Sequence, residues 1–178
     1  MRLFIALELP LEIKDYLFEI ENELKNLKAG KINWVFKKNL HITLKFLGEV
    51  KENKVKDVIE TLKTIKCKKF YVSLEDIGFY MNKLSINVIR VGFKPQEDII
   101  KLQKLIDLET LGFGDIKLGG HVTLGRIKVV KDKKSFVELF NKIKIKNLGF
   151  QINSFSLFNS ILKKDGPNYE VLETYDLL

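Results

Sequence analysis

Two short segments of this sequence repeat one pattern, and the repetition constrains the fold more than any other feature. Residues 41–44 read His-Ile-Thr-Leu, and residues 121–124, 80 positions further along, read His-Val-Thr-Leu. These segments contain the only two histidines of the 178-residue chain. By composition, a histidine would begin such a His-apolar-Thr-apolar pattern roughly 0.7% of the time. The pair therefore indicates an internal duplication, in which two equivalent lobes face each other across a groove.

Both segments are predicted to be β-strands, which gives the pattern a structural meaning. Side chains of a strand alternate between its two faces. His41 and Thr43 then share one face, and His121 and Thr123 share the equivalent face of the second copy. The apolar residues between them point the other way, into the core. Each lobe thus presents one imidazole and one hydroxyl group to the groove.

Hydrophobic periodicity predicts further strands and helices in both halves. Strands are expected at residues 2–9, 40–47, 69–74, 84–91, 121–129, 149–158 and 169–175, and helices at residues 13–27, 55–65, 95–108 and 135–143. No Pro-rich or Gly-rich linker separates them. We expect one domain over residues 1–178, of the α+β class, with two pseudo-symmetric lobes. Each lobe is an antiparallel sheet with helices on its outer face.

The charge balance favours a polyanionic partner such as RNA. The chain has 31 basic and 23 acidic residues, a net charge of +8. A cationic surface raises the local concentration of nucleic acid. Only three of the basic residues are arginine, Arg2, Arg90 and Arg126, and the other 28 are lysine. A Lys-rich surface is also typical of proteins from hot environments and of A+T-rich coding, so the charge alone does not identify the partner.

The single cysteine, Cys67, has no partner for a disulfide and no Cys or His neighbours at zinc-ligand spacing. No apolar run approaches the length needed to cross a bilayer, and the first residues do not resemble a secretion signal. We therefore expect a cytoplasmic protein that does not bind membranes. Without a long apolar surface stripe, a monomer is expected.

Two imidazoles across a groove suit an in-line displacement at phosphorus. Histidine titrates near neutral pH, so one copy can accept a proton while the other donates one. The threonine hydroxyls can donate hydrogen bonds to the non-bridging oxygens, where negative charge develops. No metal is required. Metal ligation is the competing use of two histidines, but no H-x-x-x-H or H-E-x-x-H pattern accompanies either one. The remaining interpretation is structural: the two histidines are ordinary half-buried residues of their strands and have no catalytic role.

The paired motifs resemble those of the two-histidine (2H) phosphoesterase superfamily, and specifically the RNA 2′,3′-cyclic phosphodiesterases once called 2′-5′ RNA ligases. The resemblance extends over nearly the whole chain, through the segments RLFIALELP, Trp34-Val35, NLHITLKFLGEV, HVTLGRIK and GPNYEVLETYDL. It implies two α+β lobes related by a pseudo-twofold axis, an active site between them and no cofactor.

By this resemblance, the reaction opens a 2′,3′-cyclic phosphate at an RNA end and leaves a 2′-phosphate, and ATP-independent 2′-5′ joining of RNA is its near reverse. The implied roles are those of proton donor for His41, proton acceptor for His121, and phosphate binding for Thr43 and Thr123. The residues alone allow either histidine to take either role.

The resemblance also implies that Arg126 holds phosphate and that Phe46 stacks on a nucleobase. Strict alternation places both on the face opposite the histidines, so their use requires strand twist, a bulge near Gly125 or a turned strand end. Alternation places Lys45 on the histidine face, where we expect it to be solvated. The sequence offers no reason for Gly125, since glycine weakens a strand interior.

Two alternatives remain open at this point. The same catalytic groups could act on a small cyclic nucleotide, an ADP-ribose cyclic phosphate or a 2′-5′ oligoadenylate. Alternatively, the chain could be a basic RNA-binding module without catalysis, in which the histidines are incidental.

Overall fold

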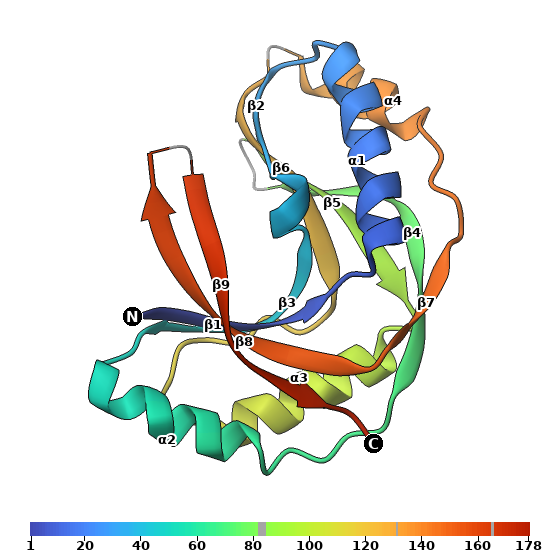
Figure 1. Ribbon diagram of the computed structural model, residues 1–178. Helices are drawn as coiled ribbons and strands as arrows, with labels where there is room; N and C mark the ends of the chain where they lie inside the picture. Colours follow the sequence, from blue (N-terminus) through green and yellow to red (C-terminus); the bar gives the residue numbers. More distant parts are fainter. Residues whose placement is uncertain (82–84, 131, 165) are drawn as a thin grey trace.

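The computed structural model describes residues 1–81, 85–130, 132–164 and 166–178 (Figure 1). Its elements, in chain order, are β1 (Arg2–Glu8), α1 (Leu11–Asn26), β2 (Lys31–Trp34), the 3-10 turn η1 (Lys37–Asn39), β3 (His41–Glu49), α2 (Glu52–Leu62), β4 (Phe70–Met81), β5 (Ile86–Lys94), α3 (Glu97–Glu109), β6 (His121–Val129), α4 (Lys133–Asn141), β7 (Gly149–Ile152), β8 (Ser154–Lys163) and β9 (Gly166–Asp176).

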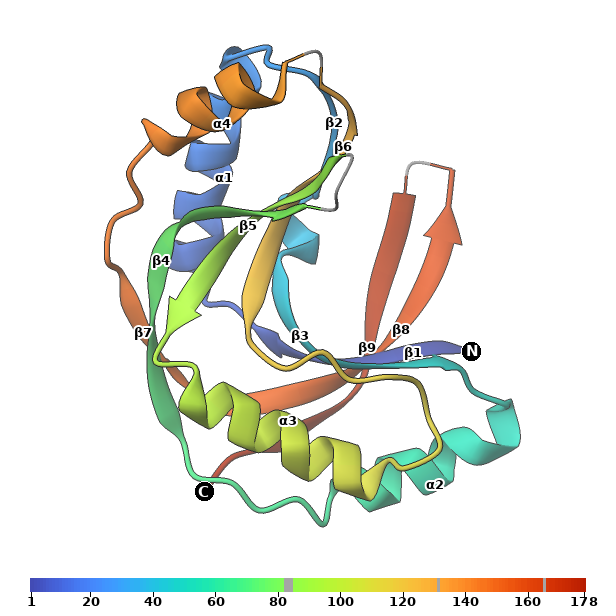
Figure 2. The same cartoon turned by 180° about the vertical axis from the view of Figure 1, so that it is seen from behind.

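The strands form one curved antiparallel sheet in the order β7-β4-β5-β6-β3-β1-β8-β9, with β2 added alongside β6. Helices α2 and α3 cover the outer face of the half that contains β1, β3, β8 and β9. Helices α1 and α4 lie on the outer side of the other half (Figures 1 and 2). The expected α+β class, with antiparallel strands and outer helices, is confirmed, and the sheets expected for the two lobes are joined into one through β3 and β6.

The two halves meet at β3 and β6, the strands that begin with the two histidines. The residues that pair there are Ile42 and Val122. Each is the second residue of its motif, and antiparallel pairing of equivalent positions relates the two strands by a local twofold rotation. The inner faces of the halves therefore present the motifs to each other, as the duplication predicts.

The predicted strand at residues 149–158 is wrong as a single element. It is two strands, β7 and β8, which end and begin on either side of Asn153. Strand β7 pairs with β4 at one end of the sheet, and β8 pairs with β1 and β9 near the other. A continuous apolar pattern cannot reveal that the chain changes partners within it.

The other differences concern lengths and one missed strand. Strand β4 continues past the predicted end at Leu74 to Met81. Its pairing with β5 shifts register between Leu74 and Ile77 and then resumes. The polar residues inside this irregularity resemble a strand end. Strand β2 has only four residues, too few for a periodic signal. Leu84, the first residue of the predicted strand 84–91, lies outside the described residues.

The main hydrophobic core lies between the sheet and the helices. The apolar stripes predicted for the helices are buried in it, as Ile13, Leu17, Ile20 and Leu24 of α1 illustrate. A separate small cluster lies on the opposite, inner face of β1. It contains Phe4, Ala6 and Phe158, with Tyr169 packed against them. This inner cluster forms one wall of the site described next.

Candidate active site

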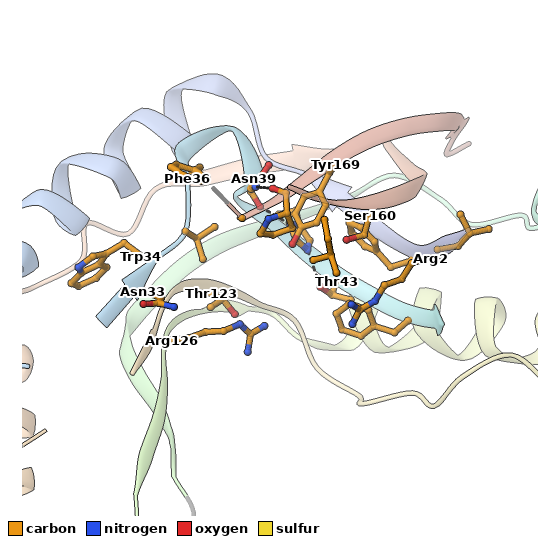
Figure 3. Close-up of a pocket in the computed structure, with 18 of the residues that line it drawn as sticks. Arg2, Asn33, Trp34, Phe36, Asn39, Thr43, Thr123, Arg126, Ser160 and Tyr169 are labelled. Carbon is orange, nitrogen blue, oxygen red and sulfur yellow. Dashed lines mark hydrogen bonds between the residues drawn. The ribbon is translucent and has the colours of Figure 1, made fainter. Parts of the chain in front are cut away.

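A cavity of about 880 Å³ opens on the inner face of the sheet, where the two halves meet. The side chains of both motifs line it, together with residues of η1, β1, β2, β8 and β9. All six candidate site residues are among its lining residues: His41, Thr43, Phe46, His121, Thr123 and Arg126. Figure 3 shows Thr43 and Thr123 extending into this space from β3 and β6, with Arg126 next to Thr123.

A bulge in each motif strand brings Phe46 and Arg126 to the histidine face. In β3, Leu44 and Lys45 are both buried, and the register with β1 shifts between the partners of Thr43 and Lys45. In β6 the same break falls at the equivalent place, just after Thr123. An extra residue reverses the alternation that follows it. Strict alternation therefore gave the wrong face for Phe46 and Arg126, and both side chains are exposed to the cavity.

The bulge also overturns the expectation of a solvated Lys45. This side chain is 2% exposed, and its ammonium group lies 2.7 Å from Asp107 Oδ1 and donates to the Thr110 carbonyl. Lys45 thus ties β3 to α3 and its C-terminal end on the outer face of the sheet. The equivalent position of β6 is Gly125. A Cβ there would lie 2.7 Å from Ile32 Cγ2. Close packing of β2 against β6 therefore explains this glycine.

His41 is held at both ring nitrogens. Its Nδ1 lies 2.6 Å from the carbonyl oxygen of Asn39, and its Nε2 lies 3.0 Å from Thr43 Oγ1. Because a carbonyl only accepts, Nδ1 carries the hydrogen and donates it. Nε2 is then the nitrogen that can exchange a proton, and it is on the side of the ring that faces Thr43. The Asn39 side chain donates to the Pro167 carbonyl, which fixes the turn that presents this acceptor.

Aromatic rings surround His41. Its ring centroid is 5.1 Å from that of Phe4 and 5.3 Å from that of Tyr169, which meets it edge-on, and Phe158 lies further away at 6.5 Å. Burial among these rings disfavours the imidazolium and lowers the pKa of His41 to about 4, despite the opposing effect of the hydrogen bond to Asn39.

His121 has a different environment. Its Nδ1 lies 3.1 Å from the hydroxyl of Tyr80, and the two rings meet edge-on at 4.9 Å. The guanidinium of Arg90 lies over the Tyr80 ring, 4.9 Å from its centroid. Burial, and then the positive charge of Arg90, lower the pKa of His121 to about 4. Both histidines are therefore neutral at pH 7 in the free protein.

Sequence reasoning missed Tyr80. The residue follows the point where the strand at 69–74 was expected to end, and a single tyrosine in an apolar stretch carries no signal of its own. The contact between Tyr80 and His121 depends on the register of β4 with β5 and of β5 with β6.

These histidine environments predict how stability depends on pH. The unfolded chain binds protons at both histidines below about pH 6.5, whereas the folded chain binds them only below about pH 4. Stability should therefore fall as the pH is lowered from 6.5 to 4, by up to about 3 kcal/mol for each histidine. This pH dependence is measured by urea unfolding of the wild type and of the double variant His41→Gln/His121→Gln between pH 6.5 and 4. The double variant should show a distinctly smaller dependence, and equal dependences would contradict the assignment.

The described residues contain no helix long and apolar enough to cross a membrane. In the same part of the chain, no three His, Cys, Asp or Glu side chains gather as metal ligands would. The polar side-chain groups that line the cavity are imidazoles, hydroxyls, amides, guanidiniums and the indole N–H of Trp34. This set can bind an oxyanion and move protons.

Comparisons with known proteins agree with this chemistry. Residues 7–90 match the family described as LigT like Phosphoesterase. A protein of Methanocaldococcus jannaschii named RNA 2′,3′-cyclic phosphodiesterase is 35% identical over 98% of this chain and 100% of its own length. A protein of Archaeoglobus fulgidus with the same name is 32% identical over 99% of this chain and 100% of its own. A crystal structure from Thermus thermophilus superimposes with a TM-score of 0.82 at 25% identity, covering 99% of this chain and 97% of the other.

Proposed function

Since the chain belongs to the LigT-like phosphoesterase family of RNA 2′,3′-cyclic phosphodiesterases, we propose that it opens RNA 2′,3′-cyclic phosphate ends by paired-histidine acid and base catalysis. A water molecule loses a proton to one imidazole and its oxygen bonds to phosphorus. The bond from phosphorus to O3′ breaks, and the other imidazole protonates O3′. The products are a 2′-phosphate and a free 3′-hydroxyl. The observation that carries this proposal is that both imidazoles and both threonine hydroxyls line one cavity.

The two histidine environments support His41 as the proton donor and His121 as the acceptor. The aromatic rings of Phe4 and Tyr169 beside His41 suit a nucleoside, whose O3′ is the leaving oxygen. The Tyr80 hydroxyl beside His121 suits a more polar site for water. In the tautomer in which His121 Nδ1 donates its hydrogen to the Tyr80 oxygen, Nε2 is unprotonated and is the atom that acts as the base.

Substrate binding allows a neutral imidazole to take up from solvent the proton that the acid needs. A cyclic phosphodiester carries one negative charge, and its approach favours the imidazolium form. The pKa of His41 should then rise from about 4 towards neutrality when substrate binds. Binding is therefore coupled to proton uptake, and one of the two neutral histidines becomes the acid in the complex.

The remaining candidate residues bind and orient the substrate. Thr43 and Thr123 donate to the non-bridging oxygens, and in the free protein Thr43 is 3.0 Å from His41 Nε2 instead. Arg126 adds a fixed positive charge beside the phosphate. Phe46, which is 53% exposed, offers a ring face to the terminal base. None of these steps uses a metal ion. If an RNA 5′-hydroxyl attacks the cyclic phosphate in place of water, the same reaction joins the two RNA ends through a 2′-5′ linkage.

We further propose that residues 1–178 work as a single bilobal domain and as a monomer, in the cytoplasm. The continuous sheet that joins both motif strands supports the first point. The buried Cys67 thiol, which has no second cysteine to pair with, supports a reducing compartment.

The direct test is hydrolysis of a short RNA that ends in a 2′,3′-cyclic phosphate, in EDTA, with separation of 2′- and 3′-phosphate products. We expect turnover to the 2′-phosphate. A panel of 2′,3′-cyclic mononucleotides, ADP-ribose cyclic phosphate and 2′-5′ oligoadenylate runs beside it. Turnover of one of these in preference to the RNA would reassign the substrate, and a 3′-phosphate product would overturn the proposed bond cleavage. If none of these substrates is turned over, a binding module is favoured.

A hydroxyl-deletion variant tests the part played by Tyr80. Tyr80→Phe keeps the ring against His121 and removes the hydrogen bond to Nδ1. We expect kcat to fall about 10-fold, with little change in KM and with a shifted pH profile of kcat, because the imidazole loses its orienting partner. Tyr71→Phe, at an exposed tyrosine of the same strand, is the matched control. Equal activity of the two variants would show that the Tyr80 hydroxyl has no role.

A further inference from the structure

Two of the three arginines of this chain line the cavity. Arg2 and Arg126 line the cavity, and Arg90 packs on the tyrosine that contacts His121. In the described part of the chain, by contrast, no lysine lines the cavity, although lysines outnumber arginines 28 to 3 in the sequence. Arginine binds phosphate through a planar fork of donors, whereas lysine acts as a mobile point charge. Arginine at the two positions that line the cavity indicates specific phosphate contacts, and Arg126, beside Thr123, already serves the reacting phosphate.

Arg2 lies at a defined distance from the catalytic centre. On the inner face of β1, Ala6 pairs with Thr43, Phe4 pairs with Phe46, and Arg2 follows two residues beyond Phe4. At about 3.3 Å per residue, the Arg2 backbone lies roughly 13 Å along the strand from the level of Thr43. In Figure 3, Thr43 lies between Arg2 and Arg126.

The order of these groups matches the order of groups in an RNA end. The terminal phosphate would lie at Thr43, the terminal nucleoside at Phe46, and the next phosphate towards the 5′ end near Arg2. The guanidinium of a long side chain can reach back from its backbone position towards Phe46. Glu49 pairs with Arg2 in register, but it is exposed and does not line the cavity.

We propose that Arg2 binds the internucleotide phosphate that precedes the terminal nucleotide, so that the site selects oligonucleotide ends over mononucleotides. This inference rests on the proposed function and adds a second phosphate subsite to it. Arg2 binds substrate away from the reacting atoms, and its contact is present in both the ground state and the transition state. Its loss should therefore raise KM and leave kcat nearly unchanged.

The test compares three substrates: a dinucleotide with a terminal 2′,3′-cyclic phosphate, the same dinucleotide with an uncharged methylphosphonate linkage, and the cyclic mononucleotide. For the wild type we expect kcat/KM to be about 10-fold or more higher for the charged dinucleotide than for the uncharged one. Arg2→Gln should have equal kcat/KM for the two dinucleotides, because its kcat/KM falls below that of the wild type for the charged dinucleotide alone. Arg2→Lys should retain part of the difference, because it keeps the charge and loses the fork.

Lys56→Gln is the matched control, since it removes one positive charge from the exposed surface of α2, outside the cavity. It should preserve the wild-type preference. Equal rates of the wild type on the two dinucleotides, or an equal loss of Arg2→Gln on all three substrates, would overturn the Arg2 subsite while the proposed function stands.

Binding measurements keep the two proposals separate. The 2′-phosphate forms of the same dinucleotides are titrated into wild type and Arg2→Gln. We expect Arg2→Gln to weaken binding of the charged dinucleotide alone. If the wild type turns over no substrate, the proposed function fails and this binding difference still decides the subsite. Equal binding by both proteins would overturn it.

Discussion

Replacing either His41 or His121 with alanine is expected to lower kcat/KM for a cyclic phosphate RNA end by at least about 10²-fold. Each imidazole moves one of the two protons in the displacement, and both line the same cavity. The double variant should be only slightly worse than either single variant, because the two groups act as a unit. Steady-state rates in EDTA at pH 7, with folding checked by circular dichroism, measure this. A single variant that keeps wild-type activity would contradict the paired mechanism.

A modified leaving group separates the two roles. In a substrate with sulfur in place of O3′, the leaving thiolate needs no proton, so the acid becomes dispensable while the base does not. We expect this substrate to restore much of the activity of His41→Ala and little of that of His121→Ala. The matched control is the oxygen substrate with the same two variants. Rescue of His121→Ala instead would reverse the assignment.

The largest effect on stability is expected from Gly114→Ala. Gly114 has a φ of +53°, and a Cβ there would overlap the carbonyl oxygen of Phe46. The alanine would meet both left-handed backbone strain and a clash with main-chain atoms of β3, so we expect a loss of roughly 3 kcal/mol or more. Because Phe46 lines the cavity, KM should rise as well. Urea unfolding and steady-state kinetics measure the two effects.

Gly112→Ala is the matched control for this change. Gly112 also has a positive φ, +86°, but a Cβ there meets no heavy atom within 4 Å. It should therefore cost only the backbone strain, about 1 to 2 kcal/mol. The difference between the two variants isolates the clash with Phe46. Equal losses of stability would show that the loop does not pack against β3 as described.

The sequence was most informative where the chemistry repeats. Both histidines and both threonines lie where period-2 alternation predicts, because an uninterrupted strand segment carries each His-x-Thr pattern. Helix α1 was also predicted closely, since its apolar stripe reports directly on burial. Repetition and periodicity are local properties, so they can be read without knowledge of strand pairing.

Features that depend on pairing between distant strands could not be decided from the sequence. Alternation showed that Phe46 and Arg126 need strand twist, a bulge or a turned strand end to reach the histidine face, and only the register with β1 and β5 shows that bulges bring them there and turn Lys45 away. Tyr80 reaches His121 through the extended β4, and Gly125 is explained only by the packing of β2. Each is set by contacts between segments far apart in the chain.

The most direct test of the central claim, that both histidines act on one bound phosphate, is nuclear magnetic resonance of the protein with ¹⁵N-labelled histidine. With two histidines in the chain, the imidazole signals come from His41 and His121 alone. In the free protein both should titrate with a pKa of about 4. Addition of a nucleoside 2′-phosphate, the expected type of product, should raise both values. A titration in which only one histidine responds, or neither, would contradict the account.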